Sequence, residues 1–299
     1  MLGTLCNLQQ GETDMPELPE VETVARTLAP HVLGWRVCAV DVRDRRCLHL
    51  LSLPLAQLEG LSIVAVRRRG KLLLLELADG QGGPLNPPLV LAVHLRMTGA
   101  LLPHAGTAEG APLPGAHTRC VFTLEDATGQ CQWLFFDDIR TFGKLLLATP
   151  EILQRWPFWC ELGPEPLETG VEEMASRLRG RRAIKAVLLD QTVLAGIGNI
   201  YADESLFAAG IDPRRKADKL SPDMVARLHS AMQAVLRQAI EQCGTSFRNY
   251  RDANGDAGAF QNQLLVYGQA GKPCPRCGRK LAKATVAGRG TVFCSRCQK

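Results

Sequence analysis

Residues 15–23, MPELPEVET, hold the residue types best suited to chemistry. The string predicts a helix start, because proline is tolerated in a first turn and acidic residues favour the positive end of the helix dipole. It also holds a candidate reactive pair, because removal of Met15 would leave Pro16 as a secondary amine beside the carboxylate of Glu17. An α-amino group, with a pKa of about 7.7–8.0, is unprotonated near neutral pH far more often than a lysine of pKa about 10.4. A secondary amine can still form an iminium intermediate.

Residues 1–14 conflict with this chemistry. While they are attached, Pro16 is a tertiary amide whose nitrogen has no available lone pair. We therefore expect the functional protein to begin at Pro16, through initiation at Met15 or through later processing. The first 14 residues contain no Lys or Arg and two acids, which is typical neither of a secretory signal nor of an Arg-rich transit peptide.

Four cysteines near the C-terminus have the spacing of a zinc site. Cys274 and Cys277 form one CxxC pair, and Cys294 and Cys297 form a second after sixteen intervening residues. This spacing is typical of paired knuckles that bind one structural Zn²⁺ tetrahedrally. So short a segment buries too little apolar surface to fold alone, so the metal must supply about 10–16 kcal/mol. Chance CxxC pairs and a redox pair fit less well, since no thioredoxin-like context surrounds them.

Charge is distributed unevenly along the chain. Of 35 basic and 30 acidic residues, 272–299 hold eight basic ones and no acidic one, which leaves a net charge of −3 on the remainder. One end of the molecule is therefore cationic and should bind a polyanion. No apolar run is long enough to cross a membrane, so we expect no membrane partner. The other seven cysteines are scattered and are expected to be reduced.

The first half of the chain predicts a helix followed by short strands. A helical stripe after residue 20 ends at Gly34, a residue type common after helix C-termini. Turn material, including the Pro/Gly-rich stretch 103–116, separates the β-rich segments. This alternation predicts a β-sandwich or a barrel-like domain. The predicted strands are 36–42, 61–68, 71–78, 89–96, 118–125, 131–136 and 143–148.

The second half is predicted to be mainly helical. Thr149 and Pro150 open a short helix, and a Pro/Gly-containing linker follows. Further helices are expected at 183–190, 200–209 and 222–242, the last capped by Ser221 and ended by Gly244. Residues 245–262 are polar and Gly-rich, which predicts a mobile loop. Together the two halves predict an α+β protein of several domains.

Seven features occur in a recognisable order: MPELPEVET (15–23), RGK (69–71), HLRMTG (94–99), DIRTFG (138–143), GIGNIYADE (196–204), FQ (260–261) with VYG (266–268), and the Cys₄ ribbon. From residue 15 to the C-terminus the chain resembles formamidopyrimidine-DNA glycosylase, a bacterial base-excision repair family. The resemblance implies an N-terminal β-sandwich with a leading helix, a helix–two-turn–helix domain and a zinc ribbon, with DNA in the cleft between. It implies these divisions: extension 1–14, catalytic domain 15–149, linker region 150–167, DNA-binding domain 168–268 and zinc finger 269–299.

The resemblance also implies catalytic roles. Pro16 is the nucleophile that attacks the sugar C1′, and Glu17 is the general acid/base near the opening ribose ring. Lys71 contacts phosphate and assists elimination, although by itself it would read as a solvated cationic strand end. Arg289, at the tip of the finger hairpin, contacts phosphate and takes part in the final elimination.

Other implied residues bind DNA. A lesion inside a duplex is inaccessible, so the nucleotide must be flipped out and the gap filled. Met97, Phe142 and Arg140 match the family's void-filling trio, with Arg140 able to hydrogen-bond the widowed cytosine. The alternative interpretation makes Met97 and Phe142 core residues and Arg140 an ion-pair partner.

Further residues are expected to contact DNA, most of them at its phosphates. His117 does so by resemblance, although alone it would read as a surface histidine. Asn199 follows a Gly-x-Gly turn and precedes a helix, which presents an amide and backbone N–H groups to a phosphate. Arg181, Arg182 and Lys185 are predicted as further phosphate contacts.

The leading hypothesis is a bifunctional glycosylase and abasic-site lyase. It would excise 8-oxoguanine and formamidopyrimidines from double-stranded DNA and cleave by β,δ-elimination through a proline Schiff base. A near alternative is an endonuclease VIII-like enzyme for oxidised pyrimidines, which Leu18 in the start motif disfavours. A different alternative is a non-catalytic damage-binding protein, required if residues 1–14 persist. We expect a monomer that works in the bacterial cytoplasm at the nucleoid.

Overall fold

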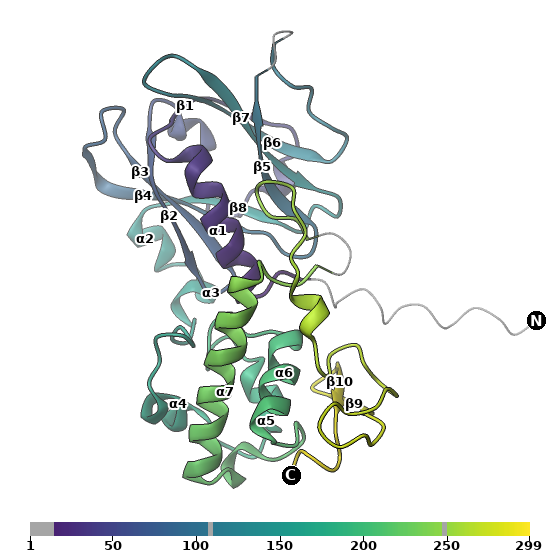
Figure 1. Cartoon of the computed structure of the whole chain (residues 1–299). Coiled ribbons are helices and arrows are strands. Elements are labelled where there is room, and N and C mark those ends of the chain that lie inside the picture. The colour runs from purple at the N-terminus through teal and green to yellow at the C-terminus, as the bar shows by residue number, and fades with distance from the viewer. Residues whose placement is uncertain (1–14, 107–109, 247–249) are drawn as a thin grey trace, which may run out of the picture. The chain divides into compact units, whose positions relative to one another are not determined.

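The computed structural model describes residues 15–106, 110–246 and 250–299, which divide into two units (Figure 1). The described residues of the first unit are 15–16, 20–106, 110–160, 246 and 250–258. Those of the second are Glu17–Pro19, Glu161–Thr245 and Ala259–Lys299. Each unit has its own core.

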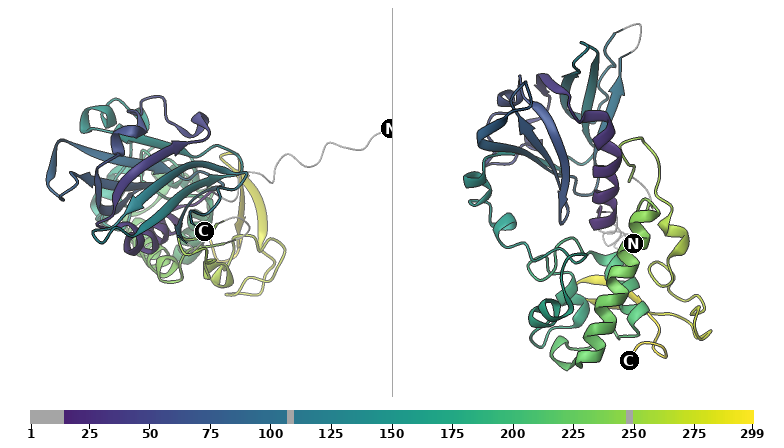
Figure 2. Two further views of the ribbon diagram at one scale, coloured as in Figure 1. Left: turned by 90° about the horizontal axis from the view of Figure 1, so that it is seen from above. Right: turned by 60° about the vertical axis from the view of Figure 1, so that its left-hand side comes forward.

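The first unit is built on an antiparallel sheet with the strand order β5-β7-β6-β1-β2-β3-β4-β8. The strands are β1 Arg36–Val42, β2 Ser62–Arg69, β3 Leu72–Ala78, β4 Pro84–His94, β5 Gly99–Ala105, β6 Thr118–Glu125, β7 Cys131–Asp138 and β8 Lys144–Ala148. A single registered pair, Arg36 with Ser62, joins β1 to β2. The ribbon of the sheet is bent into two facing halves (Figure 2). Phe122 of one half and Leu75 of the other belong to one shared core. The predicted β-sandwich is confirmed.

Helix α1, Leu18–Val32, supplies part of that core. Val21, Val24 and Leu28 are buried because their spacing of three and four residues places them on one helix face. Gly34 follows with a φ of +80°, so the predicted glycine end of the helix is confirmed. The remaining short helices of this unit are the 3₁₀ turns Arg45–Cys47 and Leu55–Leu58, α2 Pro150–Leu153 and α3 Pro157–Cys160.

Strand β5 was not predicted. Its sequence, GALLPHA, runs into the stretch expected to be turn material from residue 103. Pro103 lies opposite Leu134 on an edge strand, where a missing N–H need not remove a ladder hydrogen bond. The turn prediction for residues 103–105 was therefore wrong.

The second unit is helical with one small hairpin. Its elements are α4 Val171–Arg177, α5 Ile184–Leu188, α6 Asn199–Ala209, α7 Pro222–Glu241, the 3₁₀ turns Ala217–Lys219 and Phe260–Gln263, and strands β9 Ala282–Val286 and β10 Arg289–Phe293. Ser221 caps α7 as predicted, with its Oγ accepting a hydrogen bond from Met224 N at 3.3 Å. Helix α4 was not predicted, and its N-cap is Gly170 without a side-chain hydrogen bond.

The buried carboxylate of Glu204 fixes the chain that leads into the zinc-ribbon segment. It accepts backbone hydrogen bonds from Leu265, Val266 and Tyr267 at 3.0, 2.9 and 2.8 Å. Three orphan donors are thereby satisfied by one side chain of α6.

The described part of the predicted 245–262 loop is packed rather than free. Tyr250 Oη donates to the backbone oxygen of Glu20 at 3.1 Å, and Ala253 N donates to Thr27 Oγ1 at 3.1 Å. Both acceptors belong to α1. Residues 247–249 lie outside the described residues. Within the described ranges, no helix combines the length and apolar character needed to cross a membrane.

Candidate active site and zinc centre

Glu17 lies immediately before α1 and is held by the start of α6. Its side chain is buried, and its carboxylate accepts backbone hydrogen bonds from Ile200 at 3.0 Å and Tyr201 at 3.3 Å. The N-terminus of a helix favours a negative charge because its first N–H groups have no intrahelical partner. Pro16, the predicted nucleophile, is the preceding residue in the chain. A carboxylate is thus fixed one residue from the candidate amine.

The two glycines of the Gly-x-Gly turn allow Glu17 and Leu18 to lie against the start of α6. A Cβ on Gly198 would lie 2.2 Å from Glu17 Cδ, which no side chain tolerates. Gly196 has a φ of +88°, and a Cβ there would lie 2.8 Å from Leu18 Cβ. The N–H groups of Ile200 and Tyr201 are donated to Glu17, so they do not form the phosphate cradle expected from the sequence.

Asn199 begins α6, and its buried Oδ1 has no hydrogen-bond partner among the residues that the structure describes. A buried amide oxygen without a partner is unusual in a native structure and calls for an explanation. This oxygen is an acceptor and cannot bind a phosphate oxygen, so the phosphate contact predicted for Asn199 would need its side-chain NH₂ group and stays a prediction.

Lys71 lies at the turn between β2 and β3, after Gly70 with a φ of +57°. Only 6% of it is exposed, so it is not the solvated strand end that its type alone would suggest. His94 pairs with Leu72 across the strands, and burial, with the nearby Arg96 and Lys71 charges, lowers its pKa to about 3. A neutral histidine therefore lies among two cations in this part of the first unit.

Met97, Arg140 and Phe142 lie together, as the resemblance implied. The Arg140 guanidinium lies 4.6 Å from the centre of the Phe142 ring, and its Nη1 lies 3.2 Å from Met97 Sδ. Phe142 is 47% exposed, which contradicts the alternative interpretation that made it a core residue. The phenyl ring and the guanidinium are in the geometry of a cation–π contact. His117 is exposed one residue before β6.

Lys185 does not lie where the sequence predicted. It is fully buried and forms an ion pair of 2.7 Å with the buried Asp203. Its Nζ also donates to Gly290 O at 3.1 Å and Thr291 Oγ1 at 2.8 Å, so the ammonium group is enclosed by partners within the protein. This arrangement is incompatible with a direct phosphate contact, and Lys185 instead holds the strand that follows Arg289.

Arg289 is the first residue of β10, directly after the turn. Ala287 and Gly288 have φ of +51° and +73°, the two positive values that a two-residue type I′ hairpin turn requires. Val286 and Arg289 pair across it. The predicted position of Arg289 at a hairpin tip is thus seen in the fold. Arg181, by contrast, is exposed ahead of α5.

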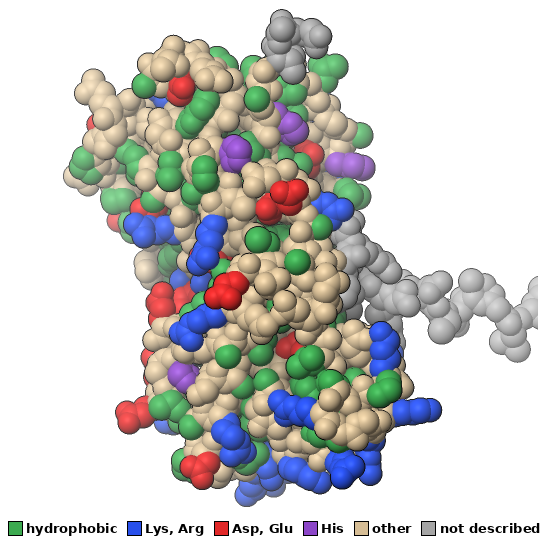
Figure 3. All heavy atoms as spheres, viewed as in Figure 1, with side chains coloured by type: hydrophobic (Ala, Val, Ile, Leu, Met, Phe, Trp, Pro, Cys, Tyr) green, Lys and Arg blue, Asp and Glu red, His purple; other side chains and the backbone are tan. Residues whose placement is uncertain are grey.

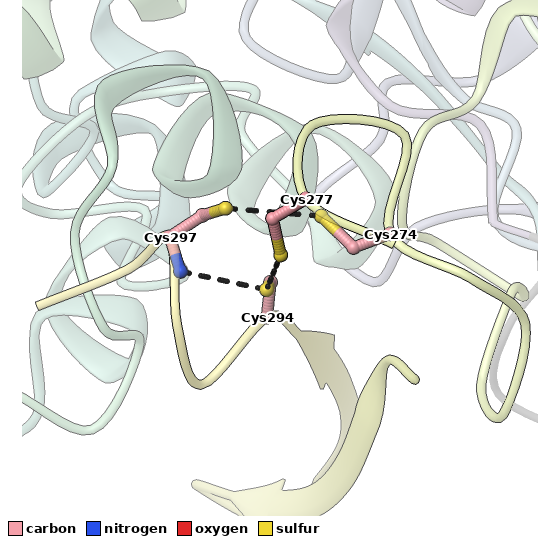
Figure 4. Close-up of side chains that lie close together, drawn as sticks. All are labelled: Cys274, Cys277, Cys294 and Cys297. Atoms are coloured by element: carbon pink, nitrogen blue, oxygen red, sulfur yellow. Dashed lines mark hydrogen bonds between the residues drawn. The ribbon is translucent and has the colours of Figure 1, made fainter. Parts of the chain in front are cut away.

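The four predicted zinc ligands converge (Figure 4). Their sulfur atoms all lie within 4.8 Å of one another, with Cys274 and Cys297 at 3.9 Å and Cys277 and Cys294 at 3.5 Å. Zn–S bonds of about 2.3 Å at tetrahedral angles place sulfurs about 3.8 Å apart. The cluster fits one structural Zn²⁺ held by four thiolates.

Basic side chains surround this ribbon on the surface. In Figure 3 they gather over the β9–β10 part of the second unit. The exposed ones from the C-terminal segment are Lys272, Arg276, Arg279, Lys280, Lys283, Arg296 and Lys299. A cationic surface of this kind suits a polyanion, as the charge distribution predicted.

Two carboxylates that organise these parts were missed in the sequence, Asp138 and Asp203. Each lies inside a motif that was read for its other members, DIRTFG and GIGNIYADE. Both are almost fully buried, at 1% exposure. The signal that could have found them is chemical. A carboxylate that is buried among functional residues must accept hydrogen bonds from its neighbours.

Three family models match the chain. They are described as "Formamidopyrimidine-DNA glycosylase N-terminal domain" over residues 15–145, "Formamidopyrimidine-DNA glycosylase H2TH domain" over 162–250 and "Zinc finger found in FPG and IleRS" over 271–299. Together the fold and these domains define a zinc-containing DNA glycosylase.

Similar proteins place the chain more narrowly. A formamidopyrimidine-DNA glycosylase of Nitratidesulfovibrio vulgaris is 42% identical, with 95% of this chain and 100% of that protein covered. The crystal structure of the MutM (Fpg) protein from Thermus thermophilus matches with a TM-score of 0.80 at 40% identity, covering 95% of this chain and 98% of that one. A Lactococcus lactis Fpg mutant in complex with Fapy-dG-containing DNA matches with a TM-score of 0.81 at 34% identity, covering 95% and 100%. The chain belongs to the formamidopyrimidine-DNA glycosylase family.

Proposed function

We propose that this protein excises oxidised purines, 8-oxoguanine and formamidopyrimidines, from duplex DNA and cleaves the resulting abasic site. The observation that carries the mechanism is the buried Glu17 carboxylate, fixed on the first N–H groups of α6 and adjacent in the chain to Pro16. A general acid/base must be held within reach of the reacting group, and two backbone N–H groups position this one.

The reaction begins with a free Pro16 nitrogen. Its lone pair forms a bond to C1′ as the bond from C1′ to the base breaks. The base leaves with the electron pair and takes up a proton, and the proline nitrogen gives up its own N–H proton. Glu17 transfers a proton at the ring oxygen as the sugar opens to the iminium. Loss of the C2′ proton then breaks the bond to the 3′ phosphate, and a second elimination releases the 5′ phosphate.

Two cations serve the elimination steps. Lys71 and Arg289 bind the phosphates on either side of the opened sugar and offset the negative charge that develops on the leaving groups. The position of Arg289 directly after a two-residue hairpin turn supports its role. The Zn²⁺ held by Cys274, Cys277, Cys294 and Cys297 has a structural role, because all four of its positions are taken by thiolates.

DNA is held by residues with separate tasks. Met97, Arg140 and Phe142 fill the gap that the extruded nucleotide leaves, and Arg140 binds the widowed cytosine. His117, Asn199 and Arg181 contact the phosphates, and the basic surface around the ribbon adds a sequence-independent, salt-dependent attraction. The protein acts as a monomer in the cytoplasm, at the chromosome.

Borohydride trapping tests the proposal. A protein whose first residue is Pro16 is incubated with a duplex that holds 8-oxoguanine opposite cytosine, and the reduced covalent adduct is resolved by mass. We expect an adduct that is lost in Pro16→Gly and in Glu17→Gln. Pro19→Ala and Glu22→Gln, changes within the same motif, serve as controls and should keep it. No adduct from a confirmed Pro16 terminus would refute the mechanism and favour a damage-binding protein.

The same assay decides two open points. A protein that keeps residues 1–14 should form no adduct, because its Pro16 nitrogen is an amide. Intact-mass analysis of protein from its native context then identifies the functional N-terminus. A duplex with an oxidised pyrimidine in place of 8-oxoguanine tests the endonuclease VIII-like alternative, for which faster trapping on the pyrimidine is the supporting result.

A further inference from the structure

The β7–β8 loop presents Arg140 and Phe142, and one buried carboxylate holds it in shape. Asp138, the last residue of β7, accepts a hydrogen bond at Oδ2 from Gly143 N at 2.7 Å. At Oδ1 it accepts one from Arg140 N at 3.1 Å and another from the hydroxyl of Thr98. The loop closes around this carboxylate, because its second and fifth residues after β7 both donate to it.

Thr98 connects the same carboxylate to the turn that carries Met97. Its Oγ1 donates to Asp138 and lies 3.2 Å from Arg140 N, which shares its hydrogen between the two acceptors. Thr98 directly follows Met97 in the chain. One carboxylate and one hydroxyl therefore fix the backbone at Met97 and at Arg140 relative to each other.

The main chain of Asp138 binds the neighbouring segment at residues 117–119. Its N donates to His117 O at 2.9 Å, and its carbonyl accepts from Arg119 Nε at 2.7 Å. Gly143 completes the arrangement, because a Cβ there would lie 2.7 Å from the Phe136 ring and 3.1 Å from Asp138 Oδ2. The carboxylate thus has both oxygens occupied and little room to move.

We infer that Asp138, with Thr98, is the positioning centre of the gap-filling surface formed by Met97, Arg140 and Phe142. It sets these three side chains before DNA arrives, so that insertion into the duplex does not also have to order the loop. This inference rests on the proposed function, in which that surface replaces the extruded nucleotide.

Asp138→Asn is a sharp test, because it keeps the shape and removes one acceptor. In either orientation of the amide, its NH₂ faces an N–H group that previously had an oxygen partner. Thr98→Val removes the hydroxyl at constant shape, and Thr98→Ser restores it. Asp126→Asn is the matched control, because Asp126 accepts from Thr128 N and Gln130 N in a turn elsewhere in the same unit.

The first measurement compares two substrates under single-turnover conditions. Excision of 8-oxoguanine opposite cytosine requires a paired base to be extruded, whereas a preformed abasic site has no base to unstack. We expect Asp138→Asn and Thr98→Val to slow excision about 10-fold to 100-fold and abasic-site cleavage less than about 3-fold. Thr98→Ser and Asp126→Asn should stay close to wild type. Equal losses on both substrates would overturn the inference, since a general structural defect affects both.

The second measurement needs no activity and separates this inference from the proposed function. Amide hydrogen exchange should show that Arg140 and Gly143 lose protection about tenfold or more in Asp138→Asn, while β8 keeps its protection. Unchanged protection would overturn the positioning role even in an active enzyme. A wild-type protein that excises no base would instead refute the proposed function, and the exchange result alone would then decide whether Asp138 orders the loop.

Discussion

The β7–β8 loop and the β9–β10 hairpin each present an arginine expected to contact DNA, but they hold it by different means. Arg140 belongs to a loop closed around one carboxylate, which accepts hydrogen bonds from a hydroxyl and from two backbone N–H groups. Arg289 follows a two-residue turn and begins β10, and the buried Lys185–Asp203 ion pair holds this strand in place. Asp203 also accepts a hydrogen bond from Val292 N at 3.0 Å.

The difference follows from the size of the core beneath each element. The β7–β8 loop joins two strands of a large sheet, so its ends are already fixed and only its middle needs ordering. The hairpin belongs to a segment that buries little apolar surface, with Leu281, Val292 and Phe293 among its few buried apolar side chains. Such a segment needs additional stabilising interactions, which a metal and a buried ion pair can supply. Removing the metal or the ion pair should therefore disturb the structure of the hairpin far more than that of the loop.

The largest effect is expected from removal of zinc. A chelator withdraws a contribution of about 10–16 kcal/mol, so the β9–β10 hairpin should unfold and Arg289 lose its position. Duplex affinity, measured by titration at fixed salt, should be abolished, while the first unit keeps its unfolding transition. Cys294→Ala should reproduce this result, and Cys131→Ser, a change of an exposed cysteine outside the cluster, should not. Unchanged affinity without zinc would contradict the role given to the ribbon.

The next largest effect is expected from Lys185→Met. The change leaves Asp203 as a buried charge without its partner, which costs about 3–5 kcal/mol of unfolding free energy. Adding Asp203→Asn removes that charge and keeps an acceptor for Val292 N, so the double variant should recover most of the loss. Denaturant unfolding of the wild type, Lys185→Met, Asp203→Asn and the double variant measures the coupling free energy between the two residues.

A single-variant loss below about 1 kcal/mol would show that the buried pair contributes little to the hairpin. Burial raises the pKa of Asp203 to about 6 and lowers that of Lys185, so desolvation opposes both charges. The pair is therefore expected to be costly to break rather than strongly favourable in itself.

The local features of these two elements could be predicted from the sequence, whereas their contacts with distant segments could not. The CxxC spacing gave the zinc ligands, and the Gly-Arg-Gly stretch gave Arg289 its place at a turn, because both depend on neighbours in the chain. The Cys₄ cluster is confirmed by the convergence of its sulfur atoms. The motif at 138–143 likewise brought Arg140 and Phe142 to notice.

The partners from distant segments could not be predicted. Thr98 lies 40 residues from Asp138, and Lys185 lies 106 residues from Thr291, so no local pattern links them. The Lys185 prediction failed for this reason, since its type and basic neighbourhood indicated a surface while its helix face points into the core. Glu17 was identified as a candidate, but its contact with α6 depends on a chain segment about 180 residues away.

A smaller effect tests the first unit through His94. Its folded-state pKa of about 3 lies below an unfolded value near 6.5, so the unfolded state binds the proton first as the pH falls. The stability that the neutral ring contributes is complete above about pH 6.5 and is lost toward pH 3, at about 1.4 kcal/mol per pH unit. Between pH 6 and 4.5 the loss should be about 2 kcal/mol and should disappear in His94→Gln. If the unfolding free energy of the variant fell just as steeply with pH, the loss would come from a group other than His94.

The smallest effect is expected from Arg182→Gln, which sharpens the comparison because Arg182 lies three residues from Lys185. Arg182 donates two hydrogen bonds of 2.9 Å to one oxygen of Asp190, Oδ2, and its side chain is 55% exposed. Solvent screens such a pair, so its loss should cost less than about 1 kcal/mol of unfolding free energy and still less at high salt. Unfolding at low and high salt, run beside Lys185→Met, measures this. A loss of similar size in both variants would mean that burial is not what fastens the hairpin.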